Sequence, residues 1–320
     1  MSRSGEFAFI NRIRERFGDI PADAMEGIGD DAAVIPCGNG EAMVLTTDML
    51  MENIHFLRQA VTPEALGGKS LAVNLSDVAA MGAAPVASLL SIALPPECRG
   101  RWSEGFMEGY HALSRRYGVP LIGGDTTSGE QIAINVVLLG RAPEPCIKRR
   151  SGAQQGDTIA VTGPLGDSAA GLRDLLAGRY DTPEAAIHHN PVPLVREGIW
   201  LGGRREVHAM IDLSDGLASD LRHIMELSDV GAEVMPECIP TRQSLELAVT
   251  GGEDYQLLFT VHPASWEEMK SLYRSTFGKE LHAIGHITQR KTAGAAENEE
   301  ILWMQHGKPV RYDWRGFTHF

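Results

Sequence analysis

The sequence lacks the features that mark several large classes of protein. Its four cysteines are far apart in the chain, at Cys37, Cys98, Cys146 and Cys238. They form neither a zinc-ligand spacing nor a disulfide framework, and such thiols are typical of the reduced cytoplasm. No apolar run reaches the roughly 18 residues of a membrane span, and the N-terminus has no run of signal-peptide type. The sequence therefore predicts a cytoplasmic protein with no membrane partner.

Basic residues are also few. The chain has 29 Lys and Arg against 42 Asp and Glu, which gives a formal net charge of −13. Sequence-independent binding to nucleic acid needs a basic surface, so we exclude that partner as well. No Ser-His-Asp or Cys-His order indicates covalent catalysis, and we assign no catalytic base or nucleophile. A small phosphorylated substrate stays compatible with the charge, because bound Mg²⁺ can reverse the local sign of a carboxylate pocket.

The length and composition predict two compact domains. The chain has 320 residues, of which 43% are hydrophobic and 22% charged, as in an ordinary soluble enzyme. Prolines, Gly152 and the basic run Lys148-Arg149-Arg150 mark residues 141–156 as the boundary. We expect an N-terminal domain over 1–145 and a larger C-terminal α/β sandwich domain over 146–320. Both halves mix hairpin and helical patterns without strict alternation, which favours α+β, with two mixed α/β domains, over a doubly wound sheet.

Apolar periodicity predicts the main elements. Helical spacing indicates helices over 7–17, 63–81, 102–117, 167–177 and 217–227. Short apolar runs indicate strands over 86–94, 131–139, 157–161, 255–260 and 282–287. Runs at 32–35 and 42–45 predict a hairpin whose second strand ends at Thr46, Thr47 and Asp48.

Short acidic motifs beside glycine or hydroxyl residues are the most informative feature. They are Gly29-Asp30-Asp31, Thr46-Thr47-Asp48, Asn74-Leu75-Ser76-Asp77, Gly123-Gly124-Asp125-Thr126-Thr127 and Asp212-Leu213-Ser214-Asp215-Gly216. Mg²⁺ is usually held by a few carboxylates together with substrate phosphates. One such motif is more often a helix cap, but a cap needs only one polar residue, so the whole set exceeds what capping requires. The set predicts a magnesium-phosphate site with several ions.

The glycine-rich segments leave several interpretations. Residues 27–32 fit the dinucleotide fingerprint formally, but a helix precedes them and a strand follows, so we reject it. Gly67-Gly68-Lys69-Ser70 resembles the end of a P-loop but lies inside a predicted helix, and we interpret Lys69 as an exposed helical residue. Gly123-Gly124 can bring backbone close to a phosphate or form a plain turn, and residues 251–255 leave the same two alternatives.

Together with residues 53–56, 81–83, 166–172 and 251–255, these motifs closely resemble the thiamine-monophosphate kinase family over nearly the whole chain. The wider superfamily includes aminoimidazole ribonucleotide synthetase, selenophosphate synthetase and a hydrogenase-maturation carbamoyl dehydratase. The tail 313–320 resembles the kinase terminus and lacks the final reactive cysteine of the hydrogenase-maturation relative. No cysteine precedes Cys37, whereas the selenophosphate family uses an early Cys or selenocysteine.

The resemblance implies an ATP-dependent kinase of thiamine diphosphate biosynthesis. It implies Mg²⁺ ligation by Asp31, Thr46, Thr47, Asp48, Asp77, Asp125, Asp212 and Asp215. It implies ATP contacts from Gly124, Asp125, Arg150 and Ser214, with Arg149 as the alternative to Arg150. It implies thiamine monophosphate contacts from His55, Glu253 and Phe317. Asp30 is either a further ligand or the residue that holds the turn. A homodimer through the strands of the N-terminal domain is also implied.

The implied reaction also explains the absence of a base. A phosphate monoester with a second pKa near ~6 is largely a dianion at neutral pH, so it needs no deprotonation before attack. We therefore expect direct in-line transfer with no phosphoenzyme, driven by positioning and metal ions. Two alternatives stay open: a ligase or synthetase that activates an amide or carbonyl oxygen with ATP, and a nucleotide- or metal-binding regulator without turnover.

Overall fold

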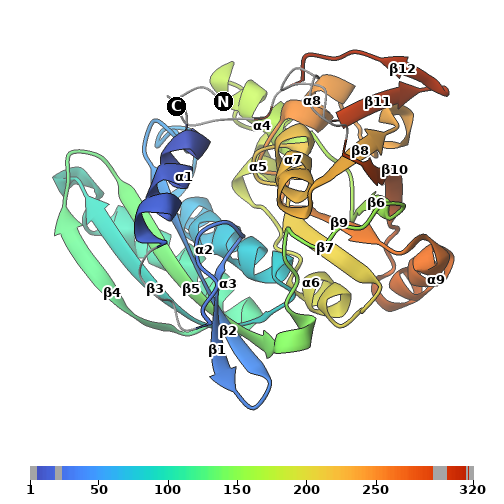
Figure 1. Cartoon of the computed structure of the whole chain (residues 1–320). Helices are drawn as coiled ribbons and strands as arrows, with labels where there is room; N and C mark the ends of the chain where they lie inside the picture. Colours follow the sequence, from blue (N-terminus) through green and yellow to red (C-terminus); the bar gives the residue numbers. More distant parts are fainter. Residues whose placement is uncertain (1–5, 19–23, 291–300, 315, 317–320) are drawn as a thin grey trace.

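The computed structural model describes residues 6–18, 24–290, 301–314 and 316. The first half of the chain forms a five-stranded sheet in the order β1-β2-β5-β3-β4 (Figure 1). Its strands are β1 Ala33–Gly38, β2 Glu41–Met51, β3 Ala84–Leu94, β4 Leu121–Ser128 and β5 Ala133–Pro143. Its helices are α1 Glu6–Phe17, α2 Pro63–Ala80 and α3 Arg101–Tyr117. The β3–β4 pair is parallel and the other pairs are antiparallel.

The second half forms a seven-stranded sheet in the order β12-β11-β8-β10-β6-β9-β7. Its strands are β6 Thr158–Val161, β7 Val207–Asp212, β8 Val230–Val234, β9 Leu257–Val261, β10 His282–Gln289, β11 Ile301–Gln305 and β12 Lys308–Val310. Its helices are α4 Asp167–Leu176, α5 Pro183–His189, α6 Val195–Gly202, α7 Leu217–Ser228, α8 Leu245–Thr250 and α9 Trp266–Phe277. Only the β11–β8 pair is parallel. Both halves therefore have a mixed sheet with helices, as predicted.

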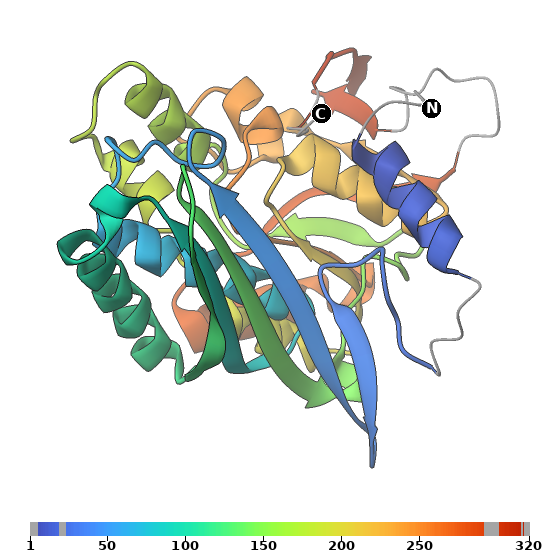
Figure 2. The ribbon, with the colours of Figure 1, turned by 90° about the vertical axis from the view of Figure 1, so that its left-hand side faces the viewer.

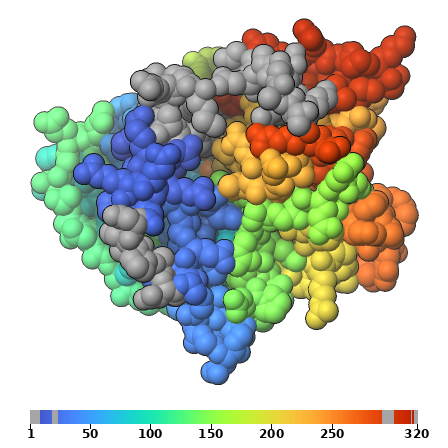
Figure 3. Space-filling model, in the orientation of Figure 1, coloured from blue at the N-terminus to red at the C-terminus, as the bar shows by residue number. Residues whose placement is uncertain are grey.

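Helix α2 lies between the two halves and packs against both. Thr62 caps its first turn by accepting the Ala65 N–H at 3.2 Å, and Pro63 occupies the first helical position. Thirteen of its 18 residues are buried, as expected of a helix that is covered on all sides. One hydrophobic cluster runs from Leu71 on α2 to Phe259 on β9. In the space-filling view the two halves likewise meet without a gap (Figure 3).

The two glycines of α2 have different surroundings. A Cβ on Gly67 would lie 2.0 Å from the Phe106 carbonyl oxygen on α3, whereas a Cβ on Gly68 would have nothing closer than 3.9 Å. Gly67 therefore lets α2 and α3 approach each other closely. The rejection of a P-loop is confirmed, because the segment is helical. The prediction that Lys69 is exposed is wrong, because its side chain is 2% exposed.

The acidic motifs of the first sheet are placed differently from the prediction. Strand β2 continues to Met51, so Thr46, Thr47 and Asp48 lie in its middle and not at its end. Residues 123–127 belong to strand β4 and do not form a turn, and all eight residues of β4 are exposed. Gly124 has a φ of +151°, and a Cβ there would meet the Leu90 carbonyl oxygen at 1.8 Å, so only glycine fits.

One face of the five-stranded sheet is covered by α2 and α3, and the other is open in the described part of the chain. Figure 2 turns this outer face toward the viewer, and no helix crosses the strands. Met49 on β2 and Ile122 on β4 are 55% and 63% exposed. Of the described helices, none has the length and apolar character required to cross a membrane.

Candidate active site

Three carboxylates meet where β2, α2 and β7 converge. Ligand atoms of Asp31, Asp77 and Asp212 all lie within 4.8 Å of one another. Asp31 and Asp212 are 8% and 2% exposed. Asp77 lies in the last turn of α2, and Asp212 is the final residue of β7. The cluster therefore joins the two halves of the chain.

Hydroxyl and amide groups surround this cluster. The Thr46 hydroxyl donates to Asp77 at 2.5 Å, and the Ser76 hydroxyl donates to Asp212 at 2.5 Å. The Asn74 side-chain oxygen accepts the Asp48 N–H at 3.1 Å. Asn74 and Ser76 are both buried on α2, two positions apart and so on different sides of the helix, and were not assigned a role from the sequence. Ser76 holds the Asp212 carboxylate, whereas Asn74 holds the backbone that carries Asp48.

The three consecutive cations at 148–150 have different partners. Lys148 is buried and donates to the carbonyl oxygens of Arg204 and Val207 at 2.7 and 2.9 Å. Arg149 pairs with Glu26 at 2.5 Å on the surface. Arg150 donates to Asp31 at 2.6 Å. Of the two arginines considered for ATP, Arg150 is the one at the cluster.

Asp30 holds the turn that presents Asp31. Its carboxylate accepts the Asp31 N–H at 3.0 Å and the Arg150 N–H at 3.1 Å. Burial, with the neighbouring charge of Asp31, raises the pKa of Asp30 to about 7. The carboxylate therefore ties together the two segments that carry Asp31 and Arg150.

Burial makes the charges of the cluster costly. Desolvation, followed by the charge of Asp31, raises the pKa of Asp212 to about 8. The same causes raise the pKa of Asp48 to about 6, and burial with the charge of Asp48 raises that of Asp77 well above its usual value. Among the described residues, the buried Asp31 Oδ2 has no hydrogen-bond partner. Clustered carboxylate oxygens with an unsatisfied lone pair fit a hard divalent cation such as Mg²⁺.

A cavity of about 600 Å³ extends from this cluster between the two halves. Its acidic end is lined by Asp48, Asp77, Ser214 and Asp215. Its other end is lined mainly by apolar side chains and two histidines: Ile54, Phe56, Leu172, Leu176, His188 and His189. A charged end and an apolar end suit a ligand that carries a phosphate on a ring system.

His55 lines the cavity beside β2. Its ring Nδ1 accepts the Met51 N–H at 3.0 Å, and the backbone N–H of His55 donates to the Met51 carbonyl oxygen at 2.9 Å. In the neutral ring the proton must then lie on Nε2. The loop is kept tight by Asn53, which has a φ of +65°. A donor of this kind suits an anionic group.

The segment 251–255 brings Glu253 to the cavity. The Glu253 N–H donates to the Ser214 carbonyl oxygen at 2.8 Å, so this segment lies against the motif that follows β7. Glu253 and Tyr255 have left-handed φ values of +63° and +49°, and both line the cavity. Asp254 accepts the N–H groups of Gly166 and Ser168 at 2.6 and 3.2 Å. Asp254 therefore fixes the start of α4.

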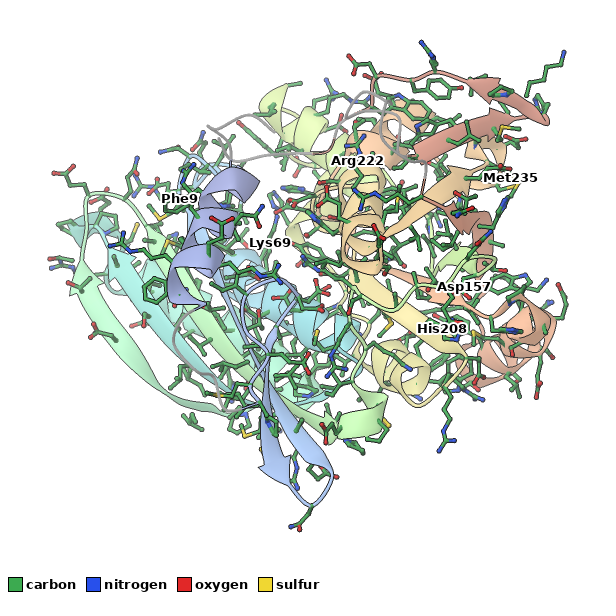
Figure 4. The ribbon with its side chains drawn as sticks, in the orientation of Figure 1. Phe9, Lys69, Asp157, His208, Arg222 and Met235 are labelled. Carbon is green, nitrogen blue, oxygen red and sulfur yellow. The ribbon has the colours of Figure 1, made fainter. Side chains whose placement is uncertain are left out.

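Glu253 is paired with a buried cation. Lys69 Nζ donates to Glu253 Oε2 at 2.9 Å and lies 3.3 Å from His188 Nε2. Figure 4 shows Lys69 at the centre of the molecule, between the two halves. Lys69 and His188 had no role in the sequence analysis, because neither belongs to an acidic motif.

Some expected residues stand apart from the cluster. Thr47 is exposed while its neighbour Thr46 is buried, so the two face opposite sides of the sheet. Asp125 lies on the exposed edge strand β4, where it pairs with Ser91 of β3. Its Oδ1 accepts the Thr126 N–H at 2.9 Å. Phe317 lies outside the described residues.

Two family descriptions match this chain. Residues 29–142 match AIR synthase related protein, N-terminal domain, and residues 154–296 match AIR synthase related protein, C-terminal domain. The thiamine-monophosphate kinase of Salmonella typhimurium is 37% identical over 332 residues, covering 99% of this chain and 98% of that protein. The enzyme of the same name from Aquifex aeolicus is 36% identical over 305 residues, covering 90% and 96%.

Solved structures agree with these relatives. The structure of AaThiL complexed with AMPPCP and TMP has a TM-score of 0.83 at 30% identity, over 100% of this chain and 98% of that one. The thiamine-monophosphate kinase of Stenotrophomonas maltophilia K279a has a TM-score of 0.74 at 35% identity, over 95% and 98%. A HypE–HypF complex, at 18% identity and a TM-score of 0.73 over 95% and 99%, shares the fold alone.

Proposed function

We infer the function from one premise: the chain belongs to the thiamine-monophosphate kinase family of AIR synthase-related proteins. We propose that it transfers the γ-phosphoryl group of ATP to thiamine monophosphate and releases thiamine diphosphate and ADP. The observation that carries this proposal is the cavity itself, which has clustered carboxylates at one end and a paired glutamate among apolar side chains at the other. The relative complexed with AMPPCP and TMP supports both substrates.

The acidic end is where the phosphates would meet. We propose that Mg²⁺ ions are held by Asp31, Thr46, Asp48, Asp77, Asp212 and Asp215, which lie in or beside the carboxylate cluster. Bound Mg²⁺ would neutralise charge on the transferred phosphoryl group. Arg150, already paired with Asp31, and Ser214 would contact ATP. His55 would donate from Nε2 to the phosphate of the acceptor.

The other end would hold the thiamine rings. Its side chains are mainly apolar, with the histidines and Glu253 among them, and thiamine carries a positively charged thiazolium and an aminopyrimidine. The charge of Lys69 lowers the pKa of Glu253, although burial opposes it, so the carboxylate is ionised at neutral pH. An ionised carboxylate attracts a cationic ring and accepts N–H bonds. We assign Phe317 to the same rings on the resemblance alone.

This division of labour supports direct in-line transfer. The acceptor phosphate is already a dianion at neutral pH, so no residue has to remove a proton. Fixing the rings at one end and the phosphate at the other places the nucleophile relative to ATP, which supplies the advantage of an intramolecular reaction. The chain then acts by positioning and by charge, without a phosphoenzyme.

We further propose a homodimer that completes the acidic end. Strand β4 is an exposed edge, and the outer sheet face carries exposed Leu45, Met49 and Ile122. In the sheet, β5 and β3 separate β4 from β2, a path of about 14 Å. Asp125 would therefore share a metal ion with Thr47, which faces the same side of the sheet, only if a second copy supplied it. Gly124, on the same strand, would approach ATP in the same way.

The test is product analysis. The purified protein is incubated with ATP and Mg²⁺ and with either thiamine monophosphate or thiamine, and the thiamine species are separated by chromatography. We expect thiamine diphosphate from the monophosphate alone, with one ADP for each product. ADP without a new thiamine species would indicate a ligase or synthetase, and nucleotide binding without ADP would indicate a regulator. Either result would overturn the proposal.

A further inference from the structure

Lys69 is an unusual residue for the middle of a buried helix. Lysine is rarely fully buried unless it is paired, and the side chain of Lys69 is 2% exposed. It extends from α2 in the first half to two partners in the second half, Glu253 before β9 and His188 on α5. Both partners line the cavity, whereas Lys69 lies behind them.

The hydrogen bonds define the state of His188. Its Nε2 faces the Lys69 ammonium at 3.3 Å, and an ammonium has only donors, so Nε2 must accept. The ring proton is then on Nδ1, which lies 3.0 Å from the Ser168 hydroxyl and 3.2 Å from Glu253 Oε2. Burial, with the nearby charge of Lys69, lowers the pKa of His188 to about 4, which agrees with a neutral ring.

The same contacts leave one oxygen of Glu253 facing the cavity. In the described part of the chain, the contacts from Lys69 and His188 both reach Oε2. The side chain as a whole is 24% exposed. Its Oε1 is not among the described buried atoms that lack a hydrogen-bond partner, and the contacts above use Oε2, so Oε1 is the exposed oxygen. One oxygen is therefore anchored from behind while the other is available to a ligand.

We propose that Lys69, with His188 as its second acceptor, is a positioning residue that fixes and charges the Glu253 carboxylate for recognition of the cationic rings of the acceptor. The proposal rests on the proposed function, because it takes Glu253 as the group that contacts those rings. Lys69 itself does not touch the substrate. Its effect should appear in the binding of thiamine monophosphate and much less in the binding of ATP.

The competing interpretation is that Lys69 only ties the two halves together. A buried ion pair contributes little net stability, because desolvation offsets the attraction, but removal of one partner leaves a costly unpaired charge. Lys69→Met alone could therefore act through folding. The double variant Lys69→Met with Glu253→Gln removes both charges and avoids this problem.

The test is a double-mutant cycle of Lys69→Met and Glu253→Gln. For each folded variant we measure kcat, KM for both substrates, and calorimetric binding of thiamine monophosphate without ATP. We expect each single variant to raise KM for thiamine monophosphate roughly 10-fold or more, with KM for ATP changed less than about 2-fold, and the double variant to match Glu253→Gln alone. Lys270→Met, which removes a surface lysine paired with Glu267, is the matched control.

A second pair of variants tests the role of His188. His188→Gln replaces Nε2 with an amide oxygen that can accept from Lys69, whereas His188→Leu has no acceptor. We expect near wild-type KM for thiamine monophosphate in the first and a clear increase in the second. Additive effects in the cycle, an equal increase in KM for ATP, or an unchanged KM in Lys69→Met would overturn the positioning role. If the wild-type protein makes no thiamine diphosphate, the proposed function fails instead.

Discussion

At one end of the cavity three carboxylates lie within 4.8 Å of one another, and at the other end a single carboxylate is held by Lys69. Burial raises the pKa of Asp212 to about 8, whereas the charge of Lys69 lowers that of Glu253 against the effect of burial. At the first end, Arg150 pairs with Asp31, one of the three clustered carboxylates. At the second end, Lys69 pairs with the single carboxylate of Glu253.

This difference in counter-charge indicates how each end would bind a ligand. Like charges that crowd together without enough counter-charge are stabilised only when cations arrive from solution. A carboxylate that is already paired keeps its charge and place without any ligand. Under the proposed function, the acidic end is completed by cations from solution, whereas the end with Glu253 is preorganised by Lys69. The following four predictions test this contrast, beginning with the largest expected effect.

Asp212→Asn should abolish most of the activity. The substitution keeps the size of the side chain and removes one charge from the cluster, so we expect kcat to fall by on the order of 10²–10³ or more. The metal-free protein should be no less stable above about pH 8, because the substitution removes the buried charge that Asp212 would carry there. Steady-state assays and thermal unfolding measure the two effects. Asp229→Asn, at an exposed position with a φ of +56° that asparagine tolerates, is the matched control and should behave as wild type.

A mixture of two inactive variants should regain activity if a second copy supplies Asp125. Asp125→Asn and Asp31→Asn are each expected to be nearly inactive. After unfolding and refolding together, half of the dimers would be mixed, and each would hold one intact site, so about a quarter of the wild-type activity should return. The same variants refolded separately provide the control. No recovery in a mixture that has formed mixed dimers would place Asp125 in the site of its own chain.

Gly67→Ala should destabilise the helix that carries both ends of the cavity. A Cβ there would meet the Phe106 carbonyl oxygen at 2.0 Å, so we expect a loss of about 1–3 kcal/mol in the free energy of unfolding. Gly68→Ala is the control, because its Cβ has room and alanine favours a helix by about 1 kcal/mol. Urea unfolding compares them. Equal stabilities would mean that α2 and α3 can move apart freely.

The smallest effect concerns Mg²⁺ and pH. The pKa of Asp212 is raised from 3.8 to about 8 in the folded protein. Between these two values the folded state therefore binds more protons than the unfolded state. The stabilisation that comes from protonated Asp212 is complete below pH 3.8 and is lost as the pH rises through about 8. Mg²⁺ binds the deprotonated carboxylates, so it should raise the melting temperature by at least about 3 °C near pH 8.5 and by less near pH 5.5. Calorimetry with EDTA or Mg²⁺ measures the shift, and a pH-independent shift would contradict this account.

The sequence was informative where a local pattern determines the structure. Periodicity located every end of α2 and α3 to within one residue, and the hairpin of β1 and β2 was confirmed. Strand β4 was missed because two glycines and an aspartate oppose strand formation, and only pairing with β3 overrides that preference. Helices α5, α6 and α9 were also missed.

The candidate site was predictable where residues lie in acidic motifs. Asp31, Asp77 and Asp212 come from three separate motifs that the fold brings together. Lys69 was misread because exposure depends on the second half of the chain, which covers a side of α2 that local sequence cannot reveal. His188 gives no signal of its own, since its role depends on the tautomer that Lys69 imposes.

Because α2 packs against both halves, its position also limits which halves of related proteins can be combined in one chain. The two family matches end and resume at residues 142 and 154, as if each half were a module. Yet the hydrophobic cluster crosses that point, and Lys69 in the first half pairs with Glu253 in the second. In a chimera joined at this link, α2 would pack against a second half from another protein. Lys69 would also face a partner other than its own Glu253. We therefore expect a working recombinant to take both halves from the same parent.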